Sequence, residues 1–166
     1  MKTKKLTLLA MYTTIALTIF VAESAIPSLL PIPGVKLGLA NIVTLWVLLS
    51  GNYKDALLVL FVRILLGSIF TGQMVSFAYS LTGGLFCLFI MTLLHKLLGD
   101  KQLVTISIAG AIFHNIGQIL VAFVILQSSG VFAYLPVLMI SGIVTGAFTG
   151  MCTKLAYQRI KHHLPK

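Results

Sequence analysis

Acidic residues are almost absent from this chain, which contains three among its 166 residues: Glu23, Asp55 and Asp100. These three lie far apart in the sequence. Paired carboxylates for acid–base catalysis and clustered carboxylates for a metal ion both need acids that a fold can bring together. We therefore expect no metal site, no cofactor and no enzymatic activity in the chain itself.

Cysteine and the short catalytic motifs are also scarce or missing. Cys87 and Cys152 lie in separate apolar runs and form no CxxC pair, so we expect free buried thiols rather than a disulfide framework. No nucleophile elbow, P-loop, HExxH or aspartate-rich diphosphate motif is present. These absences exclude a stand-alone ATPase and argue against prenyl chain elongation on this chain.

Apolar residues dominate what is present. The chain is 58% hydrophobic and 9% charged, and its mean hydropathy is +1.06. A soluble core cannot absorb that much apolar surface in a chain of this length, so the sequence predicts an all-α integral membrane protein with a single domain over residues 1–166. The basic start and the apolar run after it predict an uncleaved first membrane helix.

Apolar run lengths predict six transmembrane helices, at about residues 6–25, 39–49, 56–70, 74–98, 103–126 and 132–158. An even number of spans places both termini on one side of the membrane. Of the 12 lysines and arginines, all but Lys36 and Arg63 fall on that same side. The positive-inside rule therefore predicts that both termini are cytoplasmic, in a bacterial cell membrane.

The stretch Pro31–Asn41 interrupts this apolar pattern with two prolines, two glycines, a lysine and an asparagine. Irregular backbone at membrane depth is tolerated where protein or trapped water satisfies it, so the stretch is typical of a pocket lip on the outer side. Lys36 has two open interpretations. It is either part of a lid over a binding cavity, or an anchor that reaches the membrane interface.

Arg63 lies near the middle of the third apolar run. An unpaired cation at that depth costs several kcal/mol (roughly 3 or more), so such a residue indicates a functional site. Arg63 either pairs with Glu23, which is the one acid near the outer side, or holds an anionic group of a ligand. The sequence leaves both interpretations open.

The fifth apolar run contains His114, Asn115 and Gln118. His114 and Gln118 are four residues apart and share a helix face. Polar groups facing lipid are costly, so these three must face the bundle interior. They predict either a polar network between helices or a small-molecule pocket, and Gly117 would clear space for the pocket. A metal site is not expected, because His114 has no second histidine or cysteine nearby.

Small residues recur at every fourth position in two of the predicted helices, which allows another helix to approach closely. In the sixth helix, Gly142, Gly146 and Gly150 favour packing within the bundle. In the first helix, two interpretations stay open, internal packing or docking of a partner protein. We call the residues of the first helix the small-residue stripe, and they are Ala10, Thr14, Thr18 and Ala22.

Several segments of the sequence resemble one family closely. They are Glu23–Pro27, PGVKLGLANIVTL at Pro33–Leu45, Arg63–Gly67 and HNIGQ at His114–Gln118. Over nearly the whole chain they resemble the Gx transporter family, whose members often carry the label heptaprenyl diphosphate synthase component I. That family is similar to the substrate-binding S components of energy-coupling factor (ECF) vitamin transporters.

The resemblance implies a fold, a set of partners and a function. An S component has six helices, with both termini inside and an outward pocket closed by the loop between the first two helices. It docks onto a transmembrane coupling subunit and two ATPases through small residues of the first helix, here the small-residue stripe. The substrate would be vitamin-like or related to quinones or isoprenoids. The implied substrate-binding residues are Lys36, Asn41, Arg63, His114, Asn115 and Gln118.

A second function remains open beside transport. The synthase label allows a membrane accessory subunit in prenyl diphosphate or menaquinone metabolism that transports nothing. The lack of aspartate-rich Mg²⁺ sites argues that such a subunit would not itself carry out chain elongation.

Overall fold

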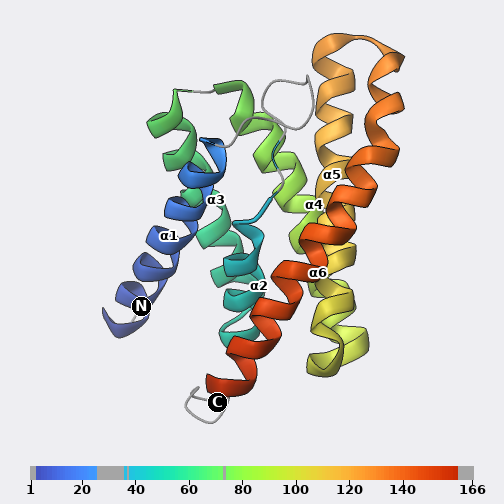
Figure 1. Ribbon diagram of the computed structural model, residues 1–166. Coiled ribbons are helices and arrows are strands. Elements are labelled where there is room, and N and C mark those ends of the chain that lie inside the picture. Colours follow the sequence, from blue (N-terminus) through green and yellow to red (C-terminus); the bar gives the residue numbers. More distant parts are fainter. Residues whose placement is uncertain (1–2, 26–35, 37, 73, 161–166) are drawn as a thin grey trace.

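A computed structural model describes residues 3–25, 36, 38–72 and 74–160 of the chain (Figure 1). All regular structure in these residues is helical. The six α-helices are α1 (Thr3–Ser24), α2 (Asn41–Ser50), α3 (Tyr53–Thr71), α4 (Met74–Leu98), α5 (Leu103–Leu126) and α6 (Leu135–Ile160). Two short 3-10 helices, η1 (Gly99–Gln102) and η2 (Ser129–Tyr134), precede α5 and α6. Of the predicted lip, Pro31–Val35 and Leu37 lie outside the described residues.

The helix pattern of the sequence is confirmed, with differences at the ends. α4 and α5 have the predicted bounds, whereas α3 begins three residues earlier than expected, at Tyr53 rather than Ala56. Asn52 explains this earlier start, because its side chain caps the helix by accepting a hydrogen bond from the backbone amide of Asp55 at 3.1 Å.

Successive helices alternate in direction, so the connections gather at two ends of the molecule (Figure 1). The start of α1 and the end of α6 lie at the lower end in Figure 1, together with the α2–α3 and α4–α5 connections. The end of α1 and the α3–α4 and α5–α6 connections lie at the upper end. The start of α1 and the end of α6 therefore lie at the same end of the molecule (Figure 1).

Among the residues that the structure describes, three helical stretches are long and apolar enough to cross a membrane, namely Thr3–Ser24, Met74–Leu126 and Ser129–Arg159. The second stretch contains both α4 and α5. Helix α2 has 10 residues, which is about 15 Å of helix and too short to span a hydrocarbon core. Helix α3 has 19 residues, and its three charged residues, Lys54, Asp55 and Arg63, exclude it from the three spanning stretches. The chain is therefore a helical membrane protein.

Glycines set the close packing of α4, α5 and α6. A Cβ atom at Gly146 would lie 2.6 Å from the Cα of Ile108, so α5 and α6 touch backbone to backbone. A Cβ at Gly117 would lie 2.8 Å from the Cα of Gly83 on α4. The expectation that Gly117 clears space for a pocket is therefore wrong, because the backbone of α4 already fills that space.

Candidate functional site

Arg63 of α3 is buried, with 3% of its surface exposed. Its Nη2 donates a hydrogen bond to Oδ1 of Asn41, the first residue of α2, at 2.7 Å. Its Nε has no hydrogen-bond partner among the described residues. One of the two open interpretations, a direct ion pair between Arg63 and Glu23 within 4 Å, is not formed, although Glu23 still attracts Arg63 electrostatically. Arg63 therefore keeps donor capacity that a ligand group can use.

The three polar residues of α5 are all buried, as predicted. The Nε2 atoms of Gln118 and His114 lie 3.2 Å apart. With the Gln118 amide as the donor, the His114 ring proton sits on Nδ1. Asn115 points toward α6 instead, where its Nδ2 donates to the carbonyl oxygen of Leu138 at 2.5 Å. Asn115 therefore has a structural contact, while His114 and Gln118 form a pair.

Gly38 joins these two groups of side chains. A Cβ atom added there would lie 2.9 Å from Nδ2 of Asn41 and 3.1 Å from Nε2 of His114. Asn41 and His114 therefore both pack against the backbone of Gly38, and Arg63 acts electrostatically on His114. We call Asn41, Arg63, His114 and Gln118 the polar cluster.

The polar cluster combines unused donors and acceptors in a buried setting. Arg63 Nε and Gln118 Oε1 have no hydrogen-bond partner among the described residues, whereas the His114 ring lies against the backbone of Gly83. Leaving a buried polar atom unpaired costs about 1–3 kcal/mol. A small molecule with both acceptor and donor groups would remove that cost, so the arrangement is suited to ligand binding.

Glu23 holds the segment that follows α1. Its Oε1 accepts from the amide of Gly38 at 2.6 Å, and its Oε2 accepts from the amide of Leu39 at 3.0 Å. The sequence suggested Glu23 only as a partner for Arg63. Gly38 is the sequence feature that indicates this contact, because a glycine lets the backbone approach other groups closely.

Lys36 lies against α1, next to this Glu23 contact. Its ammonium group donates to Oγ of Ser24 at 2.5 Å and lies 3.7 Å from the ring centroid of Phe20. Burial lowers the pKa of Lys36 to about 8, and Glu23 opposes part of that shift. These contacts attach Lys36 to the end of α1, and no hydrogen bond joins it to the polar cluster.

The small-residue stripe on α1 lies on the surface. All four residues, Ala10, Thr14, Thr18 and Ala22, are exposed. The hydroxyl of Thr14 donates to the carbonyl oxygen of Ala10 at 3.0 Å, and that of Thr18 to Thr14 at 3.0 Å. Internal packing of the stripe is therefore wrong for the described residues, because the bundle lies on the other side of α1. The hydroxyls are already satisfied, so the face presents methyl groups to its surroundings.

No metal-binding group of three or more His, Cys, Asp or Glu side chains occurs in the part of the chain that the structure describes. Asp55 is paired with Lys5 at 2.8 Å, and Asp100 with His95 at 2.9 Å. Asp100 also accepts from the hydroxyl of Tyr157 at 2.8 Å. These two acids tie helices together at the lower end of the molecule.

A family model described as heptaprenyl diphosphate synthase component I matches residues 12–156. The chain belongs to this family. The matched region includes the whole polar cluster, Glu23 and Gly38. No curated protein and no solved structure matches the chain at a significant level. The family assignment therefore rests on the sequence match over residues 12–156.

Proposed function

We propose that this member of the heptaprenyl diphosphate synthase component I family is a substrate-binding component of an ATP-driven importer of the ECF type. It would bind a small substrate from outside the bacterial cell membrane and catalyse no reaction itself. The observation that carries the proposal is the polar cluster, in which buried Arg63 has an unused Nε and buried Gln118 has an unpaired Oε1. Such an arrangement favours a ligand over a purely structural network.

The substrate class follows from the chemistry of these groups. Arg63 favours a carboxylate, phosphate or carbonyl oxygen, and Gln118 Oε1 favours a donor group. The apolar helices around the cluster favour a hydrophobic body. A vitamin-like, quinone-related or isoprenoid-related molecule with one polar end fits this description.

The energy would come from a transmembrane coupling subunit and two ATPase subunits. The exposed small-residue stripe supports this part of the proposal, since Ala10, Thr14, Thr18 and Ala22 offer a face that another helix can approach closely. In the same proposal the six helices form one membrane bundle, in which α2 crosses only part of the hydrocarbon core, and both termini lie in the cytoplasm. The orientation is supported by the sequence positions of the basic residues, of which all but Lys36 and Arg63 fall at the cytoplasmic ends of the proposed topology.

Ligand binding is tested by native mass spectrometry of the purified chain. We expect wild-type protein to retain a small molecule that Arg63→Ala and His114→Ala lose. Lys101→Ala is the matched control, because it removes an exposed cation far from the cluster. If both cluster variants retain the molecule as well as wild type does, the assignment of the site is wrong.

Partner binding is tested by coexpression with a coupling subunit and its two ATPases. We expect the four chains to copurify, and Thr14→Leu or Thr18→Leu to weaken the complex by filling the stripe. Leu8→Met, on a different face of α1, should leave it intact. Failure of wild-type protein to form any complex would remove the main support for transport.

A second function is favoured by the family description, which names a component of a synthase. In that case the chain would be a membrane accessory subunit in prenyl diphosphate or menaquinone metabolism, without transport. Copurification with a soluble prenyl diphosphate synthase subunit, and not with the coupling subunit, would identify this role.

A further inference from the structure

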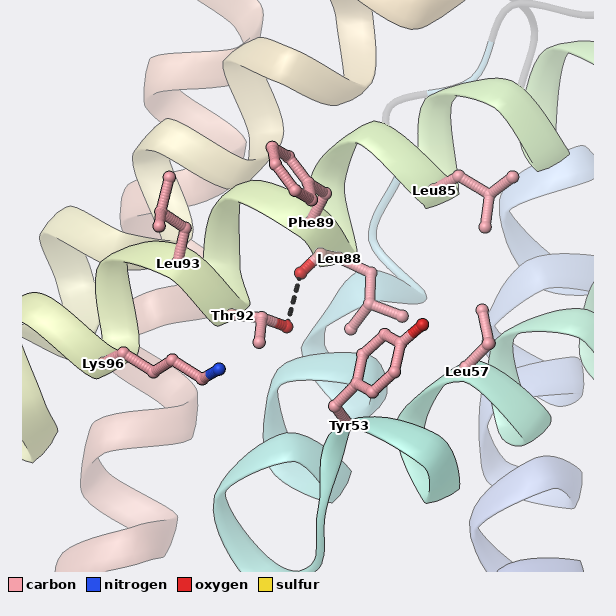
Figure 2. Close-up of a pocket in the computed structure, with 8 residues that line it drawn as sticks. All are labelled: Tyr53, Leu57, Leu85, Leu88, Phe89, Thr92, Leu93 and Lys96. Atoms are coloured by element: carbon pink, nitrogen blue, oxygen red, sulfur yellow. Dashed lines mark hydrogen bonds between the residues drawn. The ribbon is translucent and has the colours of Figure 1, made fainter.

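A groove of about 530 Å³ lies between α3 and α4, away from the polar cluster (Figure 2). Its walls are formed by two residues of α3 and six of α4. They are Tyr53, Leu57, Leu85, Leu88, Phe89, Thr92, Leu93 and Lys96. Leu88 forms a buried floor, while Phe89 is 67% exposed. The groove is thus open along its length to whatever surrounds the bundle.

The groove is apolar along most of its length, and Lys96 makes one end polar, while the Tyr53 hydroxyl points away from Lys96 toward Leu57 (Figure 2). The Thr92 hydroxyl is used internally, since it donates to the carbonyl oxygen of Leu88 at 2.7 Å (Figure 2). The remaining polar groups are the Tyr53 hydroxyl and the Lys96 ammonium group. Neither forms a hydrogen bond or ion pair with any residue that the structure describes. Both are therefore available to a ligand.

The length of the groove corresponds to one half of a bilayer. Leu85 and Lys96 mark its two ends on α4, and eleven helical steps between them span about 16 Å. A hydrocarbon core is about 30 Å thick, so one leaflet is about 15 Å. Tyr53 starts α3 and Lys96 lies in the last turn of α4, so the polar end coincides with the lower end of the molecule.

The charge at this end is basic. Lys54 and Lys101 are exposed nearby in sequence, and Lys96 faces the groove itself. A basic site between helices at a membrane surface attracts an anionic headgroup. Tyrosine is also typical of the level at which headgroups meet acyl chains.

We propose that the α3–α4 groove binds one anionic phospholipid, with an acyl chain on Leu85, Phe89 and Leu93 and its phosphate at Lys96. The lipid would belong to the leaflet at the lower end of the molecule. This site is separate from the polar cluster and does not depend on the proposed transport function.

Native mass spectrometry with added lipid tests the headgroup preference. The full chain is purified in neutral detergent and mixed with dioleoyl phosphatidylglycerol or dioleoyl phosphatidylcholine, which share the same acyl chains. We expect several-fold greater retention of phosphatidylglycerol. Lys96→Gln should lower that retention about fivefold, as expected for one basic contact. Equal retention of the two lipids by wild-type protein would overturn the proposal.

Matched variants separate the groove from general surface charge. Lys101→Gln removes a cation from the same end but outside the groove, and should leave retention unchanged. Thr92→Trp fills the groove and should reduce retention of both lipids. An effect of Lys101→Gln as large as that of Lys96→Gln would show diffuse attraction and contradict the site. Excess inorganic phosphate should not displace the lipid; displacement would show that the site takes a free anion.

Photocrosslinking locates the acyl chain. Phosphatidylglycerol with a diazirine in mid-chain should label peptides containing Leu85, Phe89 and Leu93 in reconstituted membranes. Labelling confined to other helices would overturn the proposal, and it would leave the groove to a helix of a partner protein.

Discussion

Arg63 is a buried charged residue with few hydrogen bonds to the residues that the structure describes. Its guanidinium group has one hydrogen bond, to Asn41, and an Nε atom with no described partner. Glu23 is occupied by the amides of Gly38 and Leu39 rather than by Arg63. The carboxylate therefore fixes the backbone that borders the polar cluster, and the cation remains available inside it.

Gly38→Ala should destabilise the protein more than a glycine substitution in an open turn. Gly38 has φ of +80°, and an added Cβ would lie 2.9 Å from Asn41 Nδ2. Gly72 has φ of +65° with no atom within 4 Å of the added Cβ. We expect Gly72→Ala to cost about 1 kcal/mol through the backbone alone, and Gly38→Ala about 1–3 kcal/mol more through contacts. Thermal unfolding in detergent measures both, and equal losses would contradict the packing of Asn41 and His114 on Gly38.

Lys36 should make stability depend on pH. Its folded-state pKa of about 8 lies below the ordinary value of 10.5, so the folded state binds fewer protons between these values. The free energy of unfolding should therefore rise as the pH increases from about 8 to about 10.5. We expect a gain of about 1–2 kcal/mol after allowance for solvent screening of this half-buried group.

Denaturant unfolding of wild-type protein and Lys36→Met at pH 7.5, 9 and 10.5 measures this contribution. The two proteins share all other titrating groups, so the difference between their curves isolates Lys36. Parallel curves over the whole range would show that Lys36 is fully solvated in the folded protein.

The packing of helix α6 against helix α5 depends on glycines of α6. The added Cβ atoms at Gly146 and Gly150 would lie 2.6 Å and 2.8 Å from Cα atoms of α5. Such close backbone contact substitutes for the hydrophobic effect, which does not drive helices together in lipid. The two helices consequently form one unit that carries Asn115 and the rest of the α5 polar residues.

Gly146→Ala should separate α5 from α6. The methyl group meets backbone rather than a movable side chain, so we expect a loss of about 1–3 kcal/mol. Ser141→Ala on the same helix is the control, and its loss should stay below about 0.5 kcal/mol. The thermal unfolding midpoints of the two variants and of wild-type protein measure both losses. A stable Gly146→Ala variant would mean that α6 can shift on α5 without cost.

Helix bounds could be predicted from the sequence because they depend on local patterns. The bounds of α4 and α5 follow from long, mostly apolar runs that end at Gly99 and Gln127. Burial of Arg63, His114 and Gln118 followed from the cost of exposing polar groups to lipid. The contacts of Lys36 with Phe20 and Ser24 could not be predicted, because they depend on how a loop settles against a distant helix.

Cysteine labelling tests the orientation of the whole molecule in the membrane. In a background with Cys87 and Cys152 replaced by alanine, Gly72→Cys and Ser128→Cys lie at the upper end. We expect an impermeant maleimide to label them in intact cells. Asn52→Cys and Lys101→Cys, at the lower end, should react only after the membrane is permeabilised. The opposite pattern would place both termini outside and contradict the cytoplasmic assignment.

Glu23 directly follows Ala22, the last residue of the small-residue stripe. One helix therefore carries an outward surface and, one residue later, the carboxylate that holds Gly38 and Leu39. Asp55 holds the opposite end of the same helix through Lys5. Helix α1 is therefore attached to the rest of the bundle near both of its ends. A rotation of α1 about its own axis would break the hydrogen bonds that the amides of Gly38 and Leu39 donate to Glu23, and would free the backbone that borders Asn41 and His114.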